Sequence, residues 1–189
     1  MNSSKAHSRG RAQRGRVRII GGRWRSRLVE FPGREGLRPT PDRVRETLFN
    51  WLGQDLDGLS CLDLFAGSGA LGFEAASRGA RRVVMVECDP ASVAALQENR
   101  ARLGADAVEI VRGEALAWID ATDRRFDVVF LDPPFRQNLL PAALARLSQR
   151  LAEGGRVYVE ADHAVEEPGW RVQKHARAGQ VHYQLLQRD

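Results

Sequence analysis

The sequence predicts an α/β fold in which a mostly parallel β-sheet is covered by helices on both faces. Apolar segments typical of buried strands alternate with helical segments from residue 60 onward, which implies right-handed crossovers between parallel strands. Two further strand-like segments, 170–177 and 180–187, flank Ala178-Gly179 and predict a C-terminal hairpin with an antiparallel edge. Ligands of such sheets bind beyond the carboxyl ends of the strands, so one site is expected at the turns after Phe65, Glu87, Val111 and Leu131.

The N-terminal quarter of the chain differs in charge from the rest. Residues 1–45 hold 13 Lys and Arg against 3 Asp and Glu, whereas residues 46–189 hold 16 against 21. Residues 1–15 contain almost no large apolar side chain, so we expect a disordered basic tail there. A basic arm on an acidic body predicts a polyanionic partner. Anionic lipid would require an amphipathic face that the arm lacks, and a passive solubilising tail is the remaining alternative.

A small basic β-hairpin and a loop are expected over residues 16–40. The two strands, 16–20 and 23–29, lie on either side of Gly21-Gly22, a pair typical of a tight turn. Arginines line the polar side of the hairpin, and we expect phosphate contacts with a polyanionic partner from Arg16, Arg18, Arg23 and Arg25.

An amphipathic helix is predicted next, over residues 41–52. Thr40 is expected to be its N-cap, and Pro41 suits the first helical position. Arg43 and Arg45 fall outside its apolar stripe. The stripe itself consists of Val44, Leu48, Trp51 and Leu52.

Strands and helices then alternate. The expected parallel strands are 61–65, 82–87, 108–111, 126–131 and 156–160. The expected helices are 70–77, 90–103, 115–119 and 139–151. Asp89-Pro90 is expected to cap the second of these helices, and the other end signals are glycines: Gly79, Gly104 and Gly154-Gly155.

Composition argues against metal and membrane functions. Cys61 and Cys88 lie in apolar or strand-like segments without a Cys or His at metal-ligand spacing, so we expect two reduced core thiols and no metal. No apolar run approaches the length of a membrane span, and the N-terminus lacks the apolar stretch of a secretory signal. A cytoplasmic protein without a membrane partner is therefore expected.

A glycine-rich loop follows the first buried strand. Residues 67–72 read Gly-Ser-Gly-Ala-Leu-Gly, and glycines in a G-x-G-x-x-G pattern permit a tight turn and close approach of a ligand. Glu87 lies twenty residues after Gly67, at the end of the second strand, where a carboxylate can accept hydrogen bonds from both ribose hydroxyls. The pattern predicts a cofactor that contains adenosine. Alone it fits both a nicotinamide dinucleotide and S-adenosylmethionine, and a turn without ligand is the alternative.

Three features favour S-adenosylmethionine. Asp63, four residues before Gly67, can meet the ammonium group of a methionine moiety, which NAD lacks. The chain is also too short for the separate substrate domain that dehydrogenases usually carry. The third feature is the segment after strand 126–131.

Glu114, which follows strand 108–111, can face the adenine of the cofactor, or it can simply start a helix.

The third feature that favours S-adenosylmethionine is the segment Asp132-Pro133-Pro134-Phe135. Two prolines fix the backbone and remove two amide donors, which leaves the Asp132 carboxylate and the Pro133 carbonyl as acceptors. Two acceptors that hold the hydrogens of an –NH2 group can localise its lone pair and aim it at a methyl sulfonium. Phe135 can stack on a base turned out of its helix or loop. A rigid turn with a buried aromatic ring is the alternative.

Several motifs together resemble the bacterial RsmD-type methyltransferases, which modify guanine N2 in small-subunit (16S) ribosomal RNA. They are GGRWR, GLRPTPDRVRETLFNWL, LDLFAGSGALGFEA, VECD, LDPPF and AGQVHYQLLQR, and the resemblance covers nearly the whole chain from about Arg16. It implies a Rossmann-like methyltransferase domain over residues 41–189 and S-adenosylmethionine as methyl donor, with S-adenosylhomocysteine as product. It also implies ribosomal RNA, within an assembling small subunit, as partner; we expect the protein to act as a monomer.

The resemblance carries over residue by residue to both parts of the site. The cofactor would be held by Asp63, Phe65, Gly67, Gly69 and Glu87. The guanine amino group would be held by Asp132, Pro133, Pro134 and Phe135, the last of which is often tyrosine in similar enzymes. Thr40, Arg43 and Glu46 lie in the helix that would close over the cofactor; helix cap, solvated charge and helix-dipole partner are their alternative roles.

Three other functions stay open on the residues alone. DNA adenine or cytosine amino-methyltransferases also use Asp-Pro-Pro-aromatic, although such enzymes usually need a further domain to read sequence. An NAD-dependent oxidoreductase would use the glycine loop but give residues 132–135 no role. A non-catalytic RNA-binding assembly factor would explain the basic arm but not the acceptor-only motif.

Overall fold

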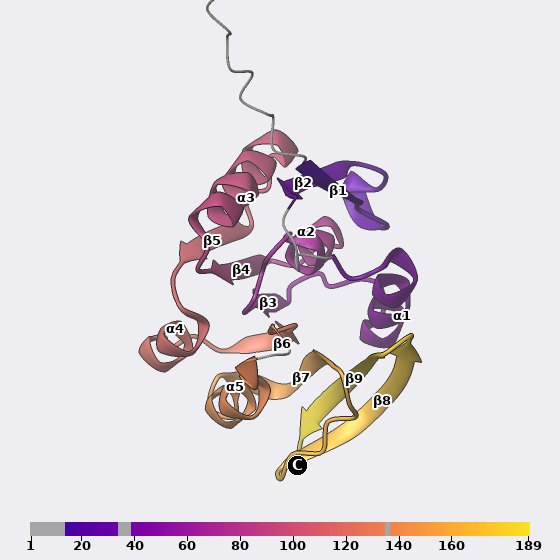
Figure 1. The fold of residues 1–189 in the computed structure, drawn as a ribbon, viewed down its shortest axis with the longest axis vertical. Helices are drawn as coiled ribbons and strands as arrows, with labels where there is room; N and C mark the ends of the chain where they lie inside the picture. The colour runs from indigo at the N-terminus through magenta and orange to yellow at the C-terminus, as the bar shows by residue number, and fades with distance from the viewer. Residues whose placement is uncertain (1–13, 34–38, 135–136) are drawn as a thin grey trace, which may run out of the picture.

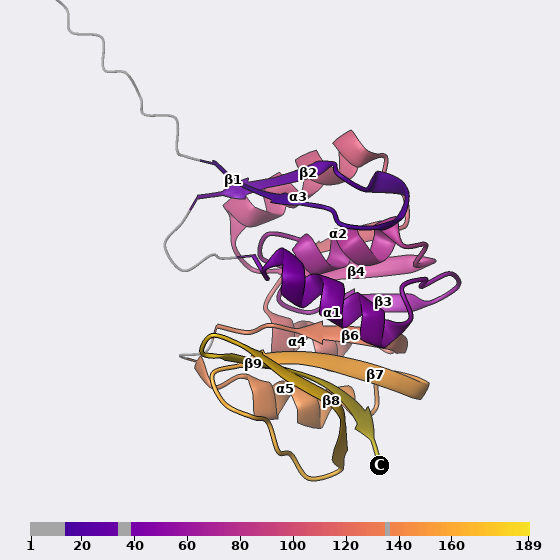
Figure 2. The same ribbon diagram turned by 90° about the vertical axis from the view of Figure 1, so that its right-hand side faces the viewer.

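A seven-stranded sheet forms the centre of the computed structural model, which describes residues 14–33, 39–134 and 137–189 (Figures 1 and 2). Its strand order is β5-β4-β3-β6-β7-β9-β8. The strands from β5 to β7 are parallel, and β9 runs antiparallel to both of its neighbours. Their bounds are β3 Ser60–Asp63, β4 Arg82–Glu87, β5 Val108–Arg112, β6 Phe126–Leu131, β7 Leu151–Ala161, β8 Trp170–Ala178 and β9 Val181–Arg188. The predicted α/β fold with its antiparallel C-terminal hairpin is confirmed.

Helices cover both faces of this sheet, because successive side chains of a buried strand point to opposite sides. Cys61 and Val83 face the core that contains α1, α2 and α3, whereas Leu62 and Val84 face the core that contains α4 and α5. The helix bounds are α1 Asp42–Leu52, α2 Ala70–Ser77, α3 Pro90–Leu103, α4 Ala115–Ala121 and α5 Leu140–Leu147. Among the described residues, no helix is long and apolar enough to cross a membrane.

The predicted helix over residues 139–151 is too long. The helix α5 ends at Leu147, and β7 already begins at Leu151. Gly154-Gly155 is therefore part of the strand and does not end the helix. Leu151 pairs with Phe126 and Arg156 with Val128, so the register shifts between the two pairs. Leu151 is buried where these strands pair. The sequence analysis assigned it to the helix because the apolar residues before it recur at helical spacing.

The predicted Gly-Gly turn in the N-terminal hairpin is wrong. The strands β1 (Arg14–Arg18) and β2 (Leu28–Pro32) are antiparallel, and a longer loop containing the 3-10 helix η1 (Gly22–Trp24) joins them. Strand β1 also begins two residues earlier than expected. Gly22 has φ of 71°, and a Cβ there would lie 1.9 Å from the Ser77 carbonyl oxygen. The glycine therefore permits close packing on α2 and does not form a two-residue turn.

Glu74 on α2 fastens the hairpin to the domain. Its carboxylate is fully buried and accepts hydrogen bonds from the backbone nitrogens of Ile20 and Gly21, both at 2.8 Å. The same carboxylate binds Arg78 Nε at 2.8 Å and Arg45 Nη1 at 3.3 Å. Arg45, expected outside the apolar stripe of its helix, is fully buried because this carboxylate neutralises it. The tail residues 1–13 lie outside the described part of the chain.

Two further expectations about single side chains are wrong. Thr40 is not the N-cap of α1; Pro41 occupies that position, and no side chain caps the helix there. Cys61 is buried as expected, but Cys88 is exposed just beyond the end of β4. The predicted cap of α3 is confirmed, since Asp89 accepts a hydrogen bond from Ser92 N at 2.7 Å.

Candidate active site

Four carboxylates gather where the central parallel strands end. Asp63 is the last residue of β3, Glu87 is the last of β4, and Asp132 follows β6 directly. Glu160 is the last but one residue of β7. Because these strands are parallel and adjacent, their carboxyl ends meet at one edge of the sheet, as the sequence predicted for the first three.

The glycine loop connects β3 to α2 beside these carboxylates. Gly67 and Gly69 have φ of 50° and 78°, the left-handed region that favours glycine. A Cβ on Gly69 would lie 2.5 Å from Leu96 Cδ2, so the backbone of the loop packs tightly on α3. The amide of Gly72 donates to Asp63 Oδ2 at 3.0 Å, which ties the first turn of α2 to the end of β3.

Glu87 holds the loop and keeps acceptor capacity. Its Oε2 accepts a hydrogen bond from Gly67 N, and its Oε1 accepts one from Asp89 N, both at 2.8 Å. An ionised carboxylate has about four lone-pair sites; the Cys88 thiol also donates to Oε1 at 3.7 Å, so Oε2 is the oxygen that can accept a further donor. The side chain is partly exposed at the loop, where it can meet the hydroxyls of a ribose.

The Asp63 carboxylate lies in a setting that favours a cationic ligand. It is buried, and burial raises its pKa to about 7; repulsion from Glu87 and Glu160 adds to the rise, while the Gly72 amide opposes it. In the described part of the chain, no Lys or Arg forms an ion pair with Asp63, Asp132 or Glu160. A ligand ammonium or sulfonium would supply the missing positive charge, so these residues fit S-adenosylmethionine.

Asp132 and the two prolines form the acceptor end of the site. Burial raises the pKa of Asp132 well above its ordinary value, and repulsion from Glu160 and then Asp63 adds to the rise. The Pro134 carbonyl accepts Gln137 N at 3.0 Å and closes the turn. Within the described residues, no hydrogen bond to the Pro133 carbonyl occurs. The stacking role expected of Phe135 falls outside the described residues.

Glu160 is a site residue that the sequence analysis missed. It is buried, and its Oε1 accepts hydrogen bonds from Thr40 Oγ1 at 2.7 Å and from Tyr158 OH at 2.9 Å. Burial raises its pKa, and the two hydroxyls oppose this rise by favouring the ionised form. An acidic residue that ends a strongly apolar strand beside the others was the signal that could have found it.

For two residues that were expected to hold the cofactor, Glu114 and Phe65, contact with the cofactor stays a prediction. Glu114 is exposed at the N-terminus of α4, where its Oε2 accepts Ala117 N at 3.0 Å. It therefore starts a helix, which was the alternative reading, and contact with adenine stays a prediction. Phe65 is partly buried against the core beneath α4 and α5.

The four hairpin arginines that were predicted to contact RNA are all exposed. Arg16 Nε pairs with Glu30 Oε1 at 3.2 Å, and Arg23 lies 4.6 Å above the Trp24 ring. The side chains of Arg18 and Arg25 make no ion pair or hydrogen bond with other described residues. The group therefore presents positive charge to solvent, and contact with RNA phosphates stays a prediction.

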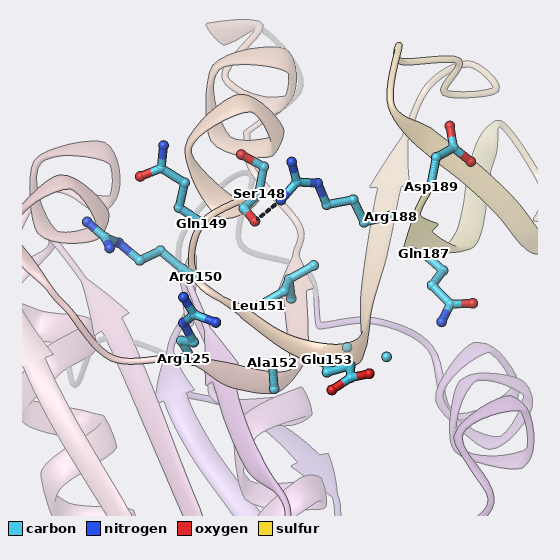
Figure 3. A pocket seen from close by; sticks show the side chains of 12 residues that line it. Arg125, Ser148, Gln149, Arg150, Leu151, Ala152, Glu153, Gln187, Arg188 and Asp189 are labelled. Carbon is cyan, nitrogen blue, oxygen red and sulfur yellow. Dashed lines mark hydrogen bonds between the residues drawn. The ribbon is translucent and has the colours of Figure 1, made fainter.

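A hollow of about 560 Å³ lies away from the candidate active site, at the opposite end of the parallel strands (Figure 3). Arg125 and Leu151 line it where β6 and β7 begin, and Arg188 closes one side by donating to the Ser148 carbonyl at 2.7 Å. None of the four site carboxylates lines this hollow. It is therefore separate from the candidate active site.

Fold and site together define a Rossmann-like, S-adenosylmethionine-dependent methyltransferase. Residues 17–187 match the family model described as "Conserved hypothetical protein 95". The chain is 42% identical over 181 residues to Ribosomal RNA small subunit methyltransferase D of Escherichia coli (strain K12), covering 93% of this chain and 91% of that one. For the Haemophilus influenzae protein of the same name, the identity is 40% over 183 residues, covering 92% and 95%. The solved structure of yhhF from Escherichia coli superposes with a TM-score of 0.82 at 44% identity, covering 93% and 99%. The chain belongs to the family of these small subunit methyltransferase D proteins.

Proposed function

We propose that this enzyme methylates the exocyclic N2 amino group of a guanine in small-subunit ribosomal RNA. The observation that carries the proposal is the acceptor-only end of β6, where Asp132 and the Pro133 carbonyl lie beside the glycine loop. The relatives named for the small ribosomal subunit support the RNA substrate. The resemblance to guanine-N2 methyltransferases supports the base and the position.

The glycine loop and the two carboxylates beside it would hold the methyl donor. Asp63 would pair with the methionine ammonium, and Glu87 would accept the ribose hydroxyls from beside Gly67. When bound, S-adenosylmethionine supplies an electrophilic methyl group on a positively charged sulfur. The neighbouring carboxylates favour this charge, since no cationic side chain neutralises them within the described residues.

The acceptor end would hold the nucleophile. Asp132 and the Pro133 carbonyl would each accept one hydrogen of the amino group, which restores its lone pair and points it at the methyl carbon. The amino nitrogen would take the methyl group from the sulfur and lose one proton, and Asp132 would accept that proton. The step needs no metal ion and no covalent enzyme intermediate.

The basic hairpin would supply affinity for RNA. The hairpin lies on the α2 and α3 side of the domain, where Glu74 fastens it (Figure 2), and its arginines are exposed. Phosphate contacts of this kind position a substrate without reading its bases. We propose a monomeric, cytoplasmic enzyme that acts on an assembling small subunit.

The test is transfer of labelled methyl from S-adenosylmethionine to small ribosomal subunits that lack the modification. The RNA is then digested and the labelled nucleoside identified. Label in N2-methylguanine is the expected result. Label in another nucleoside would refute the guanine assignment. If neither subunits nor their free RNA accept label, the substrate class is wrong, and DNA would be tested next.

A further inference from the structure

Glu160 and Asp132 are neighbours across two adjacent strands. Leu131 pairs with Val159 in the parallel register of β6 and β7, and the two acidic residues follow these partners directly. Adjacent strands lie roughly 4.8 Å apart, so the two carboxylates emerge about one strand spacing from each other. Repulsion from Glu160 raises the pKa of Asp132, which is the electrostatic consequence of this proximity.

The two oxygens of Glu160 differ in their surroundings. Oε1 accepts two hydrogen bonds, from the hydroxyls of Thr40 and Tyr158. In the part of the chain that the structure describes, Oε2 accepts none, although only 6% of the residue is exposed. The side chain is therefore fixed through one oxygen, and the other oxygen offers its lone pairs at the acceptor end of the site. Two hydroxyl donors also favour the ionised form, which only accepts hydrogen bonds.

Bases that carry an exocyclic amino group differ at the ring nitrogen beside it. Guanine has N1–H next to its 2-amino group, so this edge of the base presents two hydrogen-bond donors side by side. Adenine has N1 and cytosine has N3 next to the amino group, and both are acceptors. A second carboxylate beside the one that holds the amino group would bind the guanine N1–H and repel the lone pair of either other base.

We propose that Glu160 is a specificity-determining residue that accepts the N1–H of the target guanine while Asp132 and Pro133 hold its amino group. The proposal rests on the proposed guanine-N2 methylation and adds the reason that this site selects guanine. Thr40 and Tyr158 act through Glu160 by holding its carboxylate in place. They are positioning residues, because neither hydroxyl needs to touch the base.

The test compares guanine with 2-aminopurine at the methylated position of a synthetic RNA substrate. 2-Aminopurine keeps the 2-amino group, but its N1 is an acceptor. For the native enzyme we expect kcat/KM to be at least about tenfold lower on 2-aminopurine. In E160Q the amide can donate to that N1, so the preference for guanine should shrink to within about threefold. E153Q, an exposed change near the other end of β7, should keep the native preference.

Each outcome decides between separate claims. Equal methylation of guanine and 2-aminopurine by the native enzyme would overturn the role of Glu160, whether or not E160Q folds. So would an unchanged preference in an E160Q enzyme that melts like the native one. If E160Q instead weakens S-adenosylmethionine binding about tenfold with the base preference intact, Glu160 belongs to the cofactor. Absence of N2-methylguanine on the guanine RNA would refute the proposed function itself.

Discussion

Thr40 donates its hydroxyl hydrogen bond to Glu160 at 2.7 Å and so joins the residues before α1 to the end of β7. Since Thr40 does not cap α1, removal of the hydroxyl should leave the helix intact. We predict that Thr40→Val lowers kcat/KM by about ten- to a hundredfold, as expected for one buried hydrogen bond to a charged group. Thr40→Ser keeps the hydroxyl and should retain native activity. Steady-state kinetics with thermal melting as a folding control tests this, and a fully active valine variant would contradict it.

The pH dependence of cofactor binding should report Asp63. Its pKa is raised to about 7, and only the ionised form attracts an ammonium group. The affinity for S-adenosylmethionine should therefore increase as the pH rises from 6 to 8. Well below pH 7, the affinity should fall by about tenfold for each further pH unit. Asp63→Asn should bind weakly with a flatter profile. Calorimetric titrations across this range check the sign, and stronger native binding at pH 6 than at pH 8 would refute it.

Glu74 should contribute far more to stability than an exposed acidic residue. Its replacement by alanine would leave the buried Arg45 with only the exposed Asp42 as counter-charge and would release the backbone of the hairpin loop. We predict a loss of about 3–5 kcal/mol in the free energy of unfolding. The exposed Glu109, paired with Arg124 at 2.7 Å, provides the comparison, and its alanine variant should lose less than about 1 kcal/mol. Denaturant unfolding measures both, and similar losses would argue against the proposed anchor.

The hairpin arginines should govern RNA affinity without affecting the cofactor. Combined replacement of four exposed side chains should weaken RNA binding and flatten its dependence on salt; the four are Arg16, Arg18, Arg23 and Arg25. The affinity for S-adenosylmethionine should stay within about twofold, because the loop and its carboxylates are separate from these side chains. Filter binding over a range of salt concentrations provides the measurement. Unchanged RNA affinity would show that the hairpin is passive.

Local patterns were enough to predict most of the fold. The bounds of β4, β6 and α2 agree to the residue with the sequence analysis, because strong apolar runs and glycines define them. The positions of Asp63, Glu87 and Asp132 at one edge followed from the parallel topology. Expectations that depended on a single local signal were less secure, as Gly21-Gly22 and Gly154-Gly155 show.

Contacts between distant parts of the chain were beyond the sequence analysis. Thr40 reads as a helix cap until its partner is known to lie 120 residues away on β7. Arg45 falls outside the apolar stripe of its helix in the sequence, yet it is buried because α2 places Glu74 beside it. Both errors arose because a polar side chain near a helix start usually serves the helix or the solvent, and tertiary packing changed that role.

The most direct test of the account is the rate of methyl transfer by Asp132→Ala at saturating S-adenosylmethionine. Asp132 holds the amino group but is not needed for the donor, so the variant should bind S-adenosylmethionine within about threefold of the native affinity. Its single-turnover rate on unmodified small subunits should fall by at least about a hundredfold, the scale seen when an aligned acceptor or donor is removed. A variant that folds, binds the donor and methylates RNA at the native rate would contradict the assignment of Asp132 and the methyl-transfer mechanism built on it.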